Sequence, residues 1–359
     1  MIYPLSSRAS AIRLDPGREL DHRPEKILDC LVIGGGPAGL TAAIYLARYR
    51  RRFQVIDAGT SRAALIATSH NHAGFPEGVH GTVLLSRMTE QARKYGAHIV
   101  PGAVTGLDRR ADDVFVAELN SQRIAARTIL LATGVVDREP DLPNVPDAIQ
   151  RGLVHHCGIC EGYETLGKRV GVLGHANSGL HEALFLRTYT SDVTLLSLGC
   201  PLILSEEERR QVAEAGIAVV EEPVKHVVIE GERICAFKTR DGGHLSFDAL
   251  YSALGSDARS DLVRGLGTRL DDKGCVITDE HQRSSTDGLF AAGDVVRSLD
   301  QISVAMGEAA IAATAIHNRL RGIPALTAFG DDTLSFAPQH LASRENTSAH
   351  STLIHHGSR

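Results

Sequence analysis

Residues 30–57, CLVIGGGPAGLTAAIYLARYRRRFQVID, contain two short apolar runs separated by a glycine-rich turn and a helical pattern. Cys30–Ile33 and Phe53–Asp57 have the length and apolar content of buried strands. Leu40–Tyr49 repeats its apolar residues at helical spacing. The segment therefore predicts a strand–helix–strand unit, and this unit places the chain in the α/β class.

The turn of this unit has the spacing of a dinucleotide-binding fingerprint. Gly34, Gly36 and Gly39 form the pattern G-x-G-x-x-G, with Pro37 and Ala38 completing the turn. The first glycine permits the tight turn, the second lets the backbone approach a pyrophosphate, and the third lets helix and strand pack closely. The N–H groups at the helix start then face the phosphates. Asp57 ends the second strand, near the ~20-residue spacing of a ribose-binding acid.

A second copy of the pattern follows later in the chain, in KRVGVLGHANSGLHEALFLRTYTSDVTLLSLG. Gly174 and Gly179 hold the first and third glycine positions, but Ala176 replaces the middle glycine. Residues 197–200 after the next strand, SLGC, contain neither a carboxylate for an NAD ribose nor an arginine for an NADP phosphate. This copy either binds a nicotinamide poorly through other contacts or has kept the fold and lost the site.

Composition excludes several other classes. The chain has 359 residues with a net charge of -5, and 43% of the residues are hydrophobic. The negative charge and the lack of a basic aromatic cluster argue against nucleic acid as a partner. No apolar run is long enough to cross a bilayer, and the first residues lack the apolar core of a signal peptide. We therefore expect a cytoplasmic protein without a membrane partner.

The stretch HHCGICEGY, residues 155–163, holds the only closely spaced cysteines. A Cys-x-x-Cys pair can be part of a zinc site, a structural disulfide or a redox-active dithiol. A structural zinc normally takes four ligands and no second pair exists, so we expect no metal. A four-residue ring constrains the unfolded chain little, which favours the redox dithiol. The remaining cysteines are predicted to be buried thiols: Cys30, Cys200, Cys235 and Cys275.

The order of motifs resembles that of the low-molecular-weight thioredoxin reductases and their relatives. The glycine loop is followed by GFPEG (74–78), ATG (132–134), the cysteine pair and GLFAAGDV (288–295), and the resemblance covers roughly residues 28–322. It implies a homodimeric FAD protein with thioredoxin reductase-like architecture, namely two Rossmann-like, three-layer nucleotide-binding domains.

The resemblance also implies a domain order in which one domain interrupts another. Residues 28–146 and 257–325 would form a discontinuous FAD-binding domain. Residues 147–256 would form an NAD(P)-binding-like domain that carries the cysteine pair. Residues 1–27 would be an extension and residues 326–359 a polar tail.

Roles in the resembled family transfer onto matching positions. Asp57 would hold the adenosine half of FAD, Asp294 would contact the ribityl-phosphate side, and Gln301 would lie at the isoalloxazine. The complete set of expected FAD-binding residues is Gly34, Gly36, Pro37, Ala38, Gly39, Asp57, Ala132, Thr133, Gly134, Gly293, Asp294, Gln301 and Ile302.

The expected catalytic residues surround the cysteine pair. Cys160 would exchange electrons with the flavin, and Cys157 would be the interchange thiol that meets the substrate. Glu161, where the family has an aspartate, would be a general acid or simply an acid at a helix start. One of the preceding histidines, His155 or His156, could stabilise the thiolate if it turned inward.

Two departures from the family pattern concern the electron donor. The family's arginine-rich NADPH motif has no match near residues 196–198, and Asp300 replaces its arginine before the glutamine. We therefore expect a thiol–disulfide oxidoreductase that is not a standard NADPH user, acting on a thioredoxin-like protein or a small dithiol or disulfide. The alternatives are an NADPH-dependent thioredoxin reductase, an O2-dependent dithiol oxidase, an enzyme fed by ferredoxin or another donor, and a non-catalytic flavin redox sensor.

Overall fold

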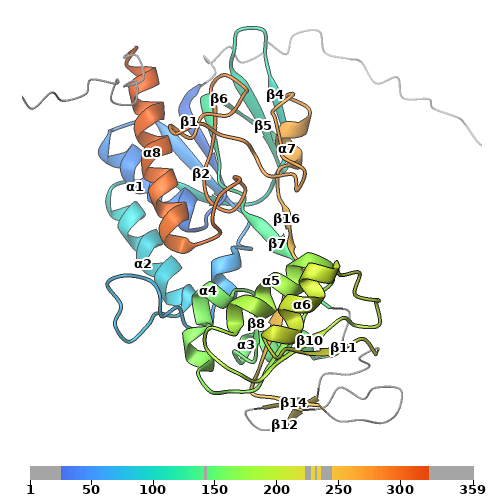
Figure 1. The fold of residues 1–359 in the computed structure, drawn as a ribbon. Coiled ribbons are helices and arrows are strands. Elements are labelled where there is room, and N and C mark those ends of the chain that lie inside the picture. The colour runs from blue at the N-terminus through green and yellow to red at the C-terminus, as the bar shows by residue number, and fades with distance from the viewer. Residues whose placement is uncertain (1–25, 141–143, 223–227, 231–232, 236–244, 323–359) are drawn as a thin grey trace, which may run out of the picture. The chain divides into compact units, whose positions relative to one another are not determined.

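The computed structural model describes residues 26–140, 144–222, 228–230, 233–235 and 245–322 (Figure 1). Nearly all of the predicted N-terminal extension and the whole of the predicted polar tail lie outside these residues.

The first predicted unit forms as expected and starts a seven-stranded sheet. β1 (Leu28–Ile33), α1 (Pro37–Arg48) and β2 (Phe53–Asp57) follow one another, and β1 and β2 pair in parallel. The sheet order is β3-β2-β1-β6-β5-β4, and β17 pairs in parallel with the second half of β6. The other strands of this sheet are β3 (Ile99–Pro101), β4 (Val104–Arg109), β5 (Phe115–Leu119), β6 (Gln122–Leu131) and β17 (Leu289–Ala291).

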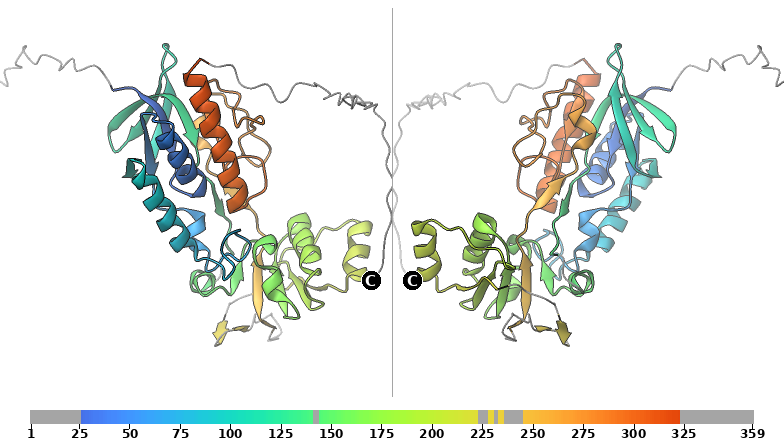
Figure 2. Two further views of the ribbon diagram at one scale, coloured as in Figure 1. Left: turned by 90° about the vertical axis from the view of Figure 1, so that its left-hand side faces the viewer. Right: turned by 90° about the vertical axis from the view of Figure 1, so that its right-hand side faces the viewer.

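Both faces of this sheet are covered, which explains the continuous apolar run in β1. Cys30 and Val32 face a cluster formed with helices α1, α2 (Gly81–Lys94) and α8 (Ile302–Leu320). Leu31 and Ile33 face the opposite cluster, which is built from β4, β5 and residues 262–296. Figures 1 and 2 show α8 running alongside α1, against which it packs through its small residues.

The second repeat forms a five-stranded parallel sheet in the order β11-β10-β9-β15-β8. Its glycine turn joins β9 to α5, as the sequence predicts. The strands are β8 (Val154–His155), β9 (Val170–Leu173), β10 (Val193–Leu196), β11 (Ala218–Val220) and β15 (Ala249–Ser252). The helices of this part are α3 (Val145–Gln150), α4 (Gly158–Glu161), α5 (Ala176–Leu186) and α6 (Glu206–Glu214).

The smaller elements connect these parts. β7 (Val135–Asp137) and β16 (Ser256–Ala258) pair as two antiparallel strands where the chain leaves and re-enters the seven-stranded sheet. The third sheet contains β12 (Val228–Glu230), β13 (Arg233–Cys235) and β14 (Ser246–Phe247). The remaining helical turns are η1 (Arg62–Leu65), η2 (Tyr163–Thr165) and α7 (Asp261–Arg264).

The chain belongs to the α/β class with two Rossmann-like sheets. The exact domain boundaries given above stay a prediction. Within the described ranges, no helix is both long enough and apolar enough to cross a bilayer.

Gly39 supports a test of the packing between α1 and β1. A Cβ at Gly39 would collide with the carbonyl oxygen of Gly34, whereas a Cβ at Gly307 in α8 would meet open space. We expect Gly39→Ala to lower the free energy of unfolding by about 2–4 kcal/mol through overpacking. Gly307→Ala should raise it by about 0.5–1 kcal/mol, because alanine is the better helix former. Urea unfolding of both variants checks this, and equal stabilities would contradict the packing constraint.

Candidate functional site: a cavity shared by a dinucleotide loop and a disulfide

The predicted site residues converge on one cavity of about 930 Å³. The turns that line it follow the carboxyl ends of β1, β2, β6 and β17, which is where ligands bind in parallel α/β sheets. Of the residues predicted to bind FAD or to act in catalysis, these line it: Gly34, Gly36, Pro37, Ala38, Asp57, Ala132, Thr133, Gly134, His156, Cys157, Cys160, Glu161, Gly293, Asp294, Gln301 and Ile302. Gly39 lies outside this lining and instead permits the contact of α1 with Gly34.

The glycine loop fits a dinucleotide. Gly34 has φ +118°, and a Cβ there would collide with the carbonyl oxygen of Ala132. At Gly36 a Cβ would intrude toward Ser61 Oγ, 3.2 Å away, and both residues line the cavity. No side chain caps the start of α1, and Pro37 occupies its first turn, so the free N–H groups of that turn are available to phosphates. FAD therefore fits this loop.

Asp57 ends β2, Asp294 lies in the turn after β17, and both residues line the cavity. Asp57 Oδ1 accepts a hydrogen bond from the N–H of Gly59 at 2.9 Å, which fixes its carboxylate beside Gly35. The Gly293–Asp294 turn is fixed from behind, because the N–H of Gly293 donates to the buried Glu308 at 2.8 Å. The Asp57 carboxylate and the Gly293–Asp294 turn are thus held in place at the cavity wall.

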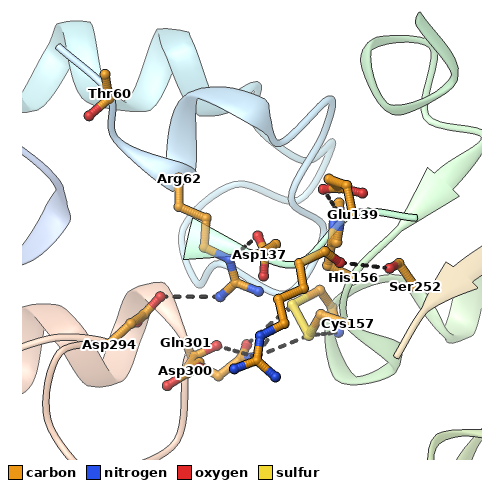
Figure 3. Close-up of polar contacts among 12 residues, drawn as sticks. Thr60, Arg62, Asp137, Glu139, His156, Cys157, Ser252, Asp294, Asp300 and Gln301 are labelled. Atoms are coloured by element: carbon orange, nitrogen blue, oxygen red, sulfur yellow. Dashed lines mark hydrogen bonds and ion pairs between the residues drawn. A yellow bond between two sulfur atoms is a disulfide. The ribbon is translucent and has the colours of Figure 1, made fainter. Parts of the chain in front are cut away.

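Arg62 joins two acids inside the cavity (Figure 3). Its Nε donates to Asp137 at 2.7 Å, and its Nη1 donates to Asp294 at 3.2 Å. Asp300 lies in the same charged group, and burial raises the pKa of its carboxyl to about 6, with the negative charge of Asp294 adding to the rise. One guanidinium therefore compensates several carboxylates at this wall.

The cysteine pair is a disulfide at the start of α4. Cys157 and Cys160 are bonded to each other with their Cα atoms 5.3 Å apart. Cys157 is the N-cap residue, and its sulfur accepts a hydrogen bond from the N–H of Cys160 at 3.1 Å. The N–H of Gly158 donates to Glu182 of α5 at 2.7 Å, and this bond holds the turn on the second sheet. Burial raises the pKa of Glu182, although this bond opposes the rise.

Gln301, which directly precedes α8 on the seven-stranded sheet, contacts the disulfide. Its Nε2 lies 3.3 Å from Cys157 Sγ and 3.3 Å from Cys160 Sγ. The residue is the N-cap of α8, but its side chain forms no cap and is free to reach the sulfurs. Its amide therefore contacts both sulfurs of the pair.

Each of the two histidines before the pair contacts a different carboxylate. His156 Nε2 lies 2.6 Å from Glu139 Oε1, and His155 Nδ1 lies 3.2 Å from Glu161 Oε2. Burial disfavours the charged form of His156. The bond with Glu139 and the charge of Asp137 outweigh burial, and they raise its pKa above the usual value. His156 is therefore fixed by Glu139, and the Glu161 carboxylate contacts a histidine.

In the second glycine loop, two glycines let a strand and a helix pack closely. A Cβ at Gly174 would lie 2.5 Å from the Cα of Gly179, so these two glycines bring strand β9 and helix α5 together. After β10, Ser197 is fully buried and its hydroxyl has no partner among the described residues. Leu198 and Gly199 then turn through the left-handed region, with φ of 57° and 85°. The loop thus has the Rossmann backbone at the predicted place.

The other cysteines depart in part from the sequence prediction. Cys30 is buried as predicted, and burial raises the pKa of its thiol to about 12. Cys275 is only half-buried, so the prediction of a buried thiol is not confirmed there, and Cys200 is exposed, so the prediction is wrong at Cys200. The Cys235 side chain lies outside the part of the chain that the structure describes. Cys200 follows the left-handed turn at Leu198 and Gly199, which carries it past the end of β10 and away from the core.

Several residues of the site carry no signal in the sequence. Arg62, Asn71, Glu139, Glu182 and Glu308 reach the cavity or the turns around it through contacts between distant segments. A lone glutamate on a small-residue helix, such as Glu308, is the kind of pattern break that could have identified one of them.

A dinucleotide cavity that also holds a redox-type disulfide defines a disulfide oxidoreductase with a nucleotide cofactor. Residues 28–309 match the family described as "Pyridine nucleotide-disulphide oxidoreductase". The chain belongs to this family, and it is an FAD-dependent disulfide oxidoreductase of the thioredoxin reductase-like kind.

Individual relatives agree with this membership. A thioredoxin reductase of Aquifex aeolicus is 29% identical over 84% of this chain and 96% of its own length. The crystal structure of HlmI has 30% identity and a TM-score of 0.76, and the match covers 82% of this chain and 93% of that one. The thioredoxin reductase of Streptococcus pyogenes has 26% identity and a TM-score of 0.76, with 83% and 99% covered.

The pKa of Asp300 predicts a pH-dependent effect on stability. Because the folded protein holds the Asp300 proton more tightly than the unfolded chain does, this carboxyl costs stability as pH rises from about 4 through about 6. Asp300→Asn removes that cost. We expect it to be more stable than the wild type by about 1–2 kcal/mol near pH 8, allowing for solvent screening, with the difference vanishing near pH 4.

Asp287→Asn provides a control of opposite sign. A hydrogen bond from Arg319 lowers the pKa of Asp287, so this carboxylate contributes stability above its unfolded pKa. The control variant should therefore lose stability at neutral pH. Denaturant unfolding at both pH values measures both variants, and a pH-independent difference for Asp300→Asn would contradict the assignment.

Proposed function

We propose that this protein passes electrons between FAD and a dithiol or disulfide substrate through Cys157 and Cys160, and that NADPH is not its main electron donor. The observation that carries the proposal is the position of the disulfide. It lines the same cavity as the dinucleotide loop, with Gln301 in contact with both sulfurs.

The contacts at the sulfurs support different roles for the two cysteines. Cys157 Sγ accepts from the N–H of Cys160 and from Gln301, whereas Cys160 Sγ accepts from Gln301. Donors stabilise a thiolate, so Cys157 is the better thiolate of the reduced pair and the residue to attack a substrate disulfide. The attack forms a mixed disulfide and releases one substrate thiolate. Cys160 then displaces the second substrate thiol, which leaves a reduced substrate and the Cys157–Cys160 disulfide.

The reverse sequence oxidises a dithiol and leaves the pair reduced. Bound FAD supplies a two-electron acceptor and donor for the pair. In either direction the chain must hold protons for the thiols. Two histidine–carboxylate contacts, His156–Glu139 and His155–Glu161, involve residues next to the cysteine pair in the sequence. We propose His156 and Glu161 as the groups that hold these protons.

The proposal about NADPH rests on missing chemistry in the second loop. Residues 197–200 offer a buried serine, a leucine, a glycine and an exposed cysteine where a cofactor ribose or its phosphate would need an acid or an arginine. Asp300 beside Gln301 adds a carboxylate where the resembled family has an arginine. Electrons would then come from a dithiol or another protein donor, or leave to O2.

A second candidate is NADPH-dependent reduction of thioredoxin. It is favoured by the names of relatives such as the Aquifex aeolicus and Streptococcus pyogenes thioredoxin reductases. A thioredoxin-like protein is then the partner. Family membership argues against the non-catalytic sensor. The homodimer and the cytoplasmic location stay predictions.

Cysteine variants test the role of the pair. Without oxygen, dithiothreitol should bleach the visible absorbance of the bound flavin in the wild type. In Cys160→Ser the pair cannot form its disulfide, so bleaching by dithiothreitol should slow by at least about a hundredfold. Cys200→Ser removes an exposed thiol outside the cavity and should bleach like the wild type. Unchanged bleaching in Cys160→Ser would refute the proposal.

A titration with nicotinamides tests the electron donor. We expect NADPH and NADH to bleach the flavin far more slowly than dithiothreitol, because the second loop lacks contacts for either ribose. The measurement is stopped-flow absorbance under anaerobic conditions. Rapid bleaching at micromolar NADPH would contradict this part of the proposal and favour the second candidate.

A further inference from the structure

Gln301 is the one described side chain whose polar group contacts both sulfurs of the pair. Sulfur atoms in a disulfide carry no hydrogen, so the amide NH2 of Gln301 must be the donor in these contacts. A donor at this position matters for the redox equilibrium because it stabilises a thiolate more than a neutral disulfide sulfur.

Two backbone carbonyls fix the orientation of the amides. The Asp300 carbonyl lies 2.9 Å from Gln301 Nε2, and the Ile159 carbonyl lies 3.4 Å from Asn71 Nδ2. A carbonyl can only accept, so both NH2 groups must face these oxygens. Asn71 Nδ2 then donates to Gln301 Oε1 at 2.9 Å, which leaves the NH2 of Gln301 toward the sulfurs.

Asn71 is itself held from behind. Its Oδ1 accepts from the hydroxyl of Ser69 at 3.2 Å. Ser69 is buried, and its backbone exchanges two hydrogen bonds with Val79, at 2.8 Å and 3.0 Å. The chain of contacts from Ser69 through Asn71 to Gln301 therefore begins at a fixed point of the backbone.

We propose that Asn71 is a positioning residue for the cysteine pair. It holds the amide of Gln301 with its donors toward both sulfurs, and it thereby raises the reduction potential of the Cys157–Cys160 disulfide. Reduction takes up two electrons and one proton, breaks the S–S bond and leaves one thiol and one thiolate. The Gln301 donor stabilises that thiolate. Without Asn71, Gln301 Oε1 loses its donor, and only the Asp300 carbonyl still opposes a turn of the amide that would bring its oxygen to the sulfurs.

The proposal rests on the proposed function only in taking the pair as redox-active. Its test equilibrates the flavin-loaded enzyme with dithiothreitol redox buffers, alkylates the free thiols and counts them by mass spectrometry. We expect Asn71→Ala to lower the equilibrium constant for reduction about fivefold, equivalent to about 20 mV for a two-electron couple. Flavin content, read from visible absorbance, separates loss of cofactor from a change in the pair.

A double-mutant cycle distinguishes positioning from a general structural role. Gln301→Leu removes the donor and should lower the constant at least as much as Asn71→Ala does. In the Gln301→Leu background, Asn71→Ala should then change it by less than about twofold, since its effect passes through the amide. Gln54→Ala is the matched control. Its amide contacts His98 outside the cavity, so it should leave the constant unchanged.

Two results would overturn the proposal. One is a change below twofold in a folded Asn71→Ala or in Gln301→Leu, and the other is full additivity in the double variant. The Gln301→Leu measurement stands even where Asn71→Ala does not fold. Failure of the proposed function has a different signature, because Cys160→Ser would then leave flavin bleaching intact whatever the potential of the pair.

Discussion

The site depends on one close approach of backbone to backbone. Gly34 passes so near the carbonyl of Ala132 that no side chain fits between them, and Gly39 lets α1 pack equally close to Gly34. These approaches bring the turns after β1 and β6 together at the carboxyl end of the sheet. The start of α1, Asp57 and Asp294 then line one cavity, where a dinucleotide would find N–H donors and a ribose acceptor. A methyl group at either glycine would collide with a backbone carbonyl, push these segments apart and change the shape of the cavity.

The second constraint is the meeting of the two sheets at the disulfide. The pair begins α4 and is held by Glu182 of α5, both parts of the second repeat. Gln301 and Asn71, which contact the sulfurs and the Cys157–Cys160 turn, follow strands of the first sheet. In the function proposed above, the pair exchanges electrons with both the flavin and the substrate, so it has to be reachable from both. The same cavity holds the Arg62 guanidinium, which donates to Asp137 and Asp294. Its positive charge offsets the cost of burying these two carboxylates.

The strand–helix–strand unit and its repeat could be predicted because their signals are local. The unit combines an apolar run, three glycines at fixed spacing and a helical period within about thirty residues. These features predict a strand, a tight turn and a helix in that order. The cysteine pair was recognisable for the same reason. The prediction failed at Cys200, where apolar neighbours suggested burial but a left-handed turn at Leu198 and Gly199 exposes the thiol. Residues such as Arg62 and Asn71 could not be predicted, since their partners lie far away in the chain.

The sequence by itself determined the class of fold, the dinucleotide loop and the chemistry available at Cys157 and Cys160. It could do so because backbone conformation and thiol chemistry follow from residue type and spacing. Only the tertiary structure decided which side chains contact the sulfurs and which carboxylates share a charge. Those contacts join Ser69, Asn71 and Gln301 to Cys157 and Cys160 across segments that no periodicity connects. Their geometry exists only after two sheets have folded and their turns have met at one cavity.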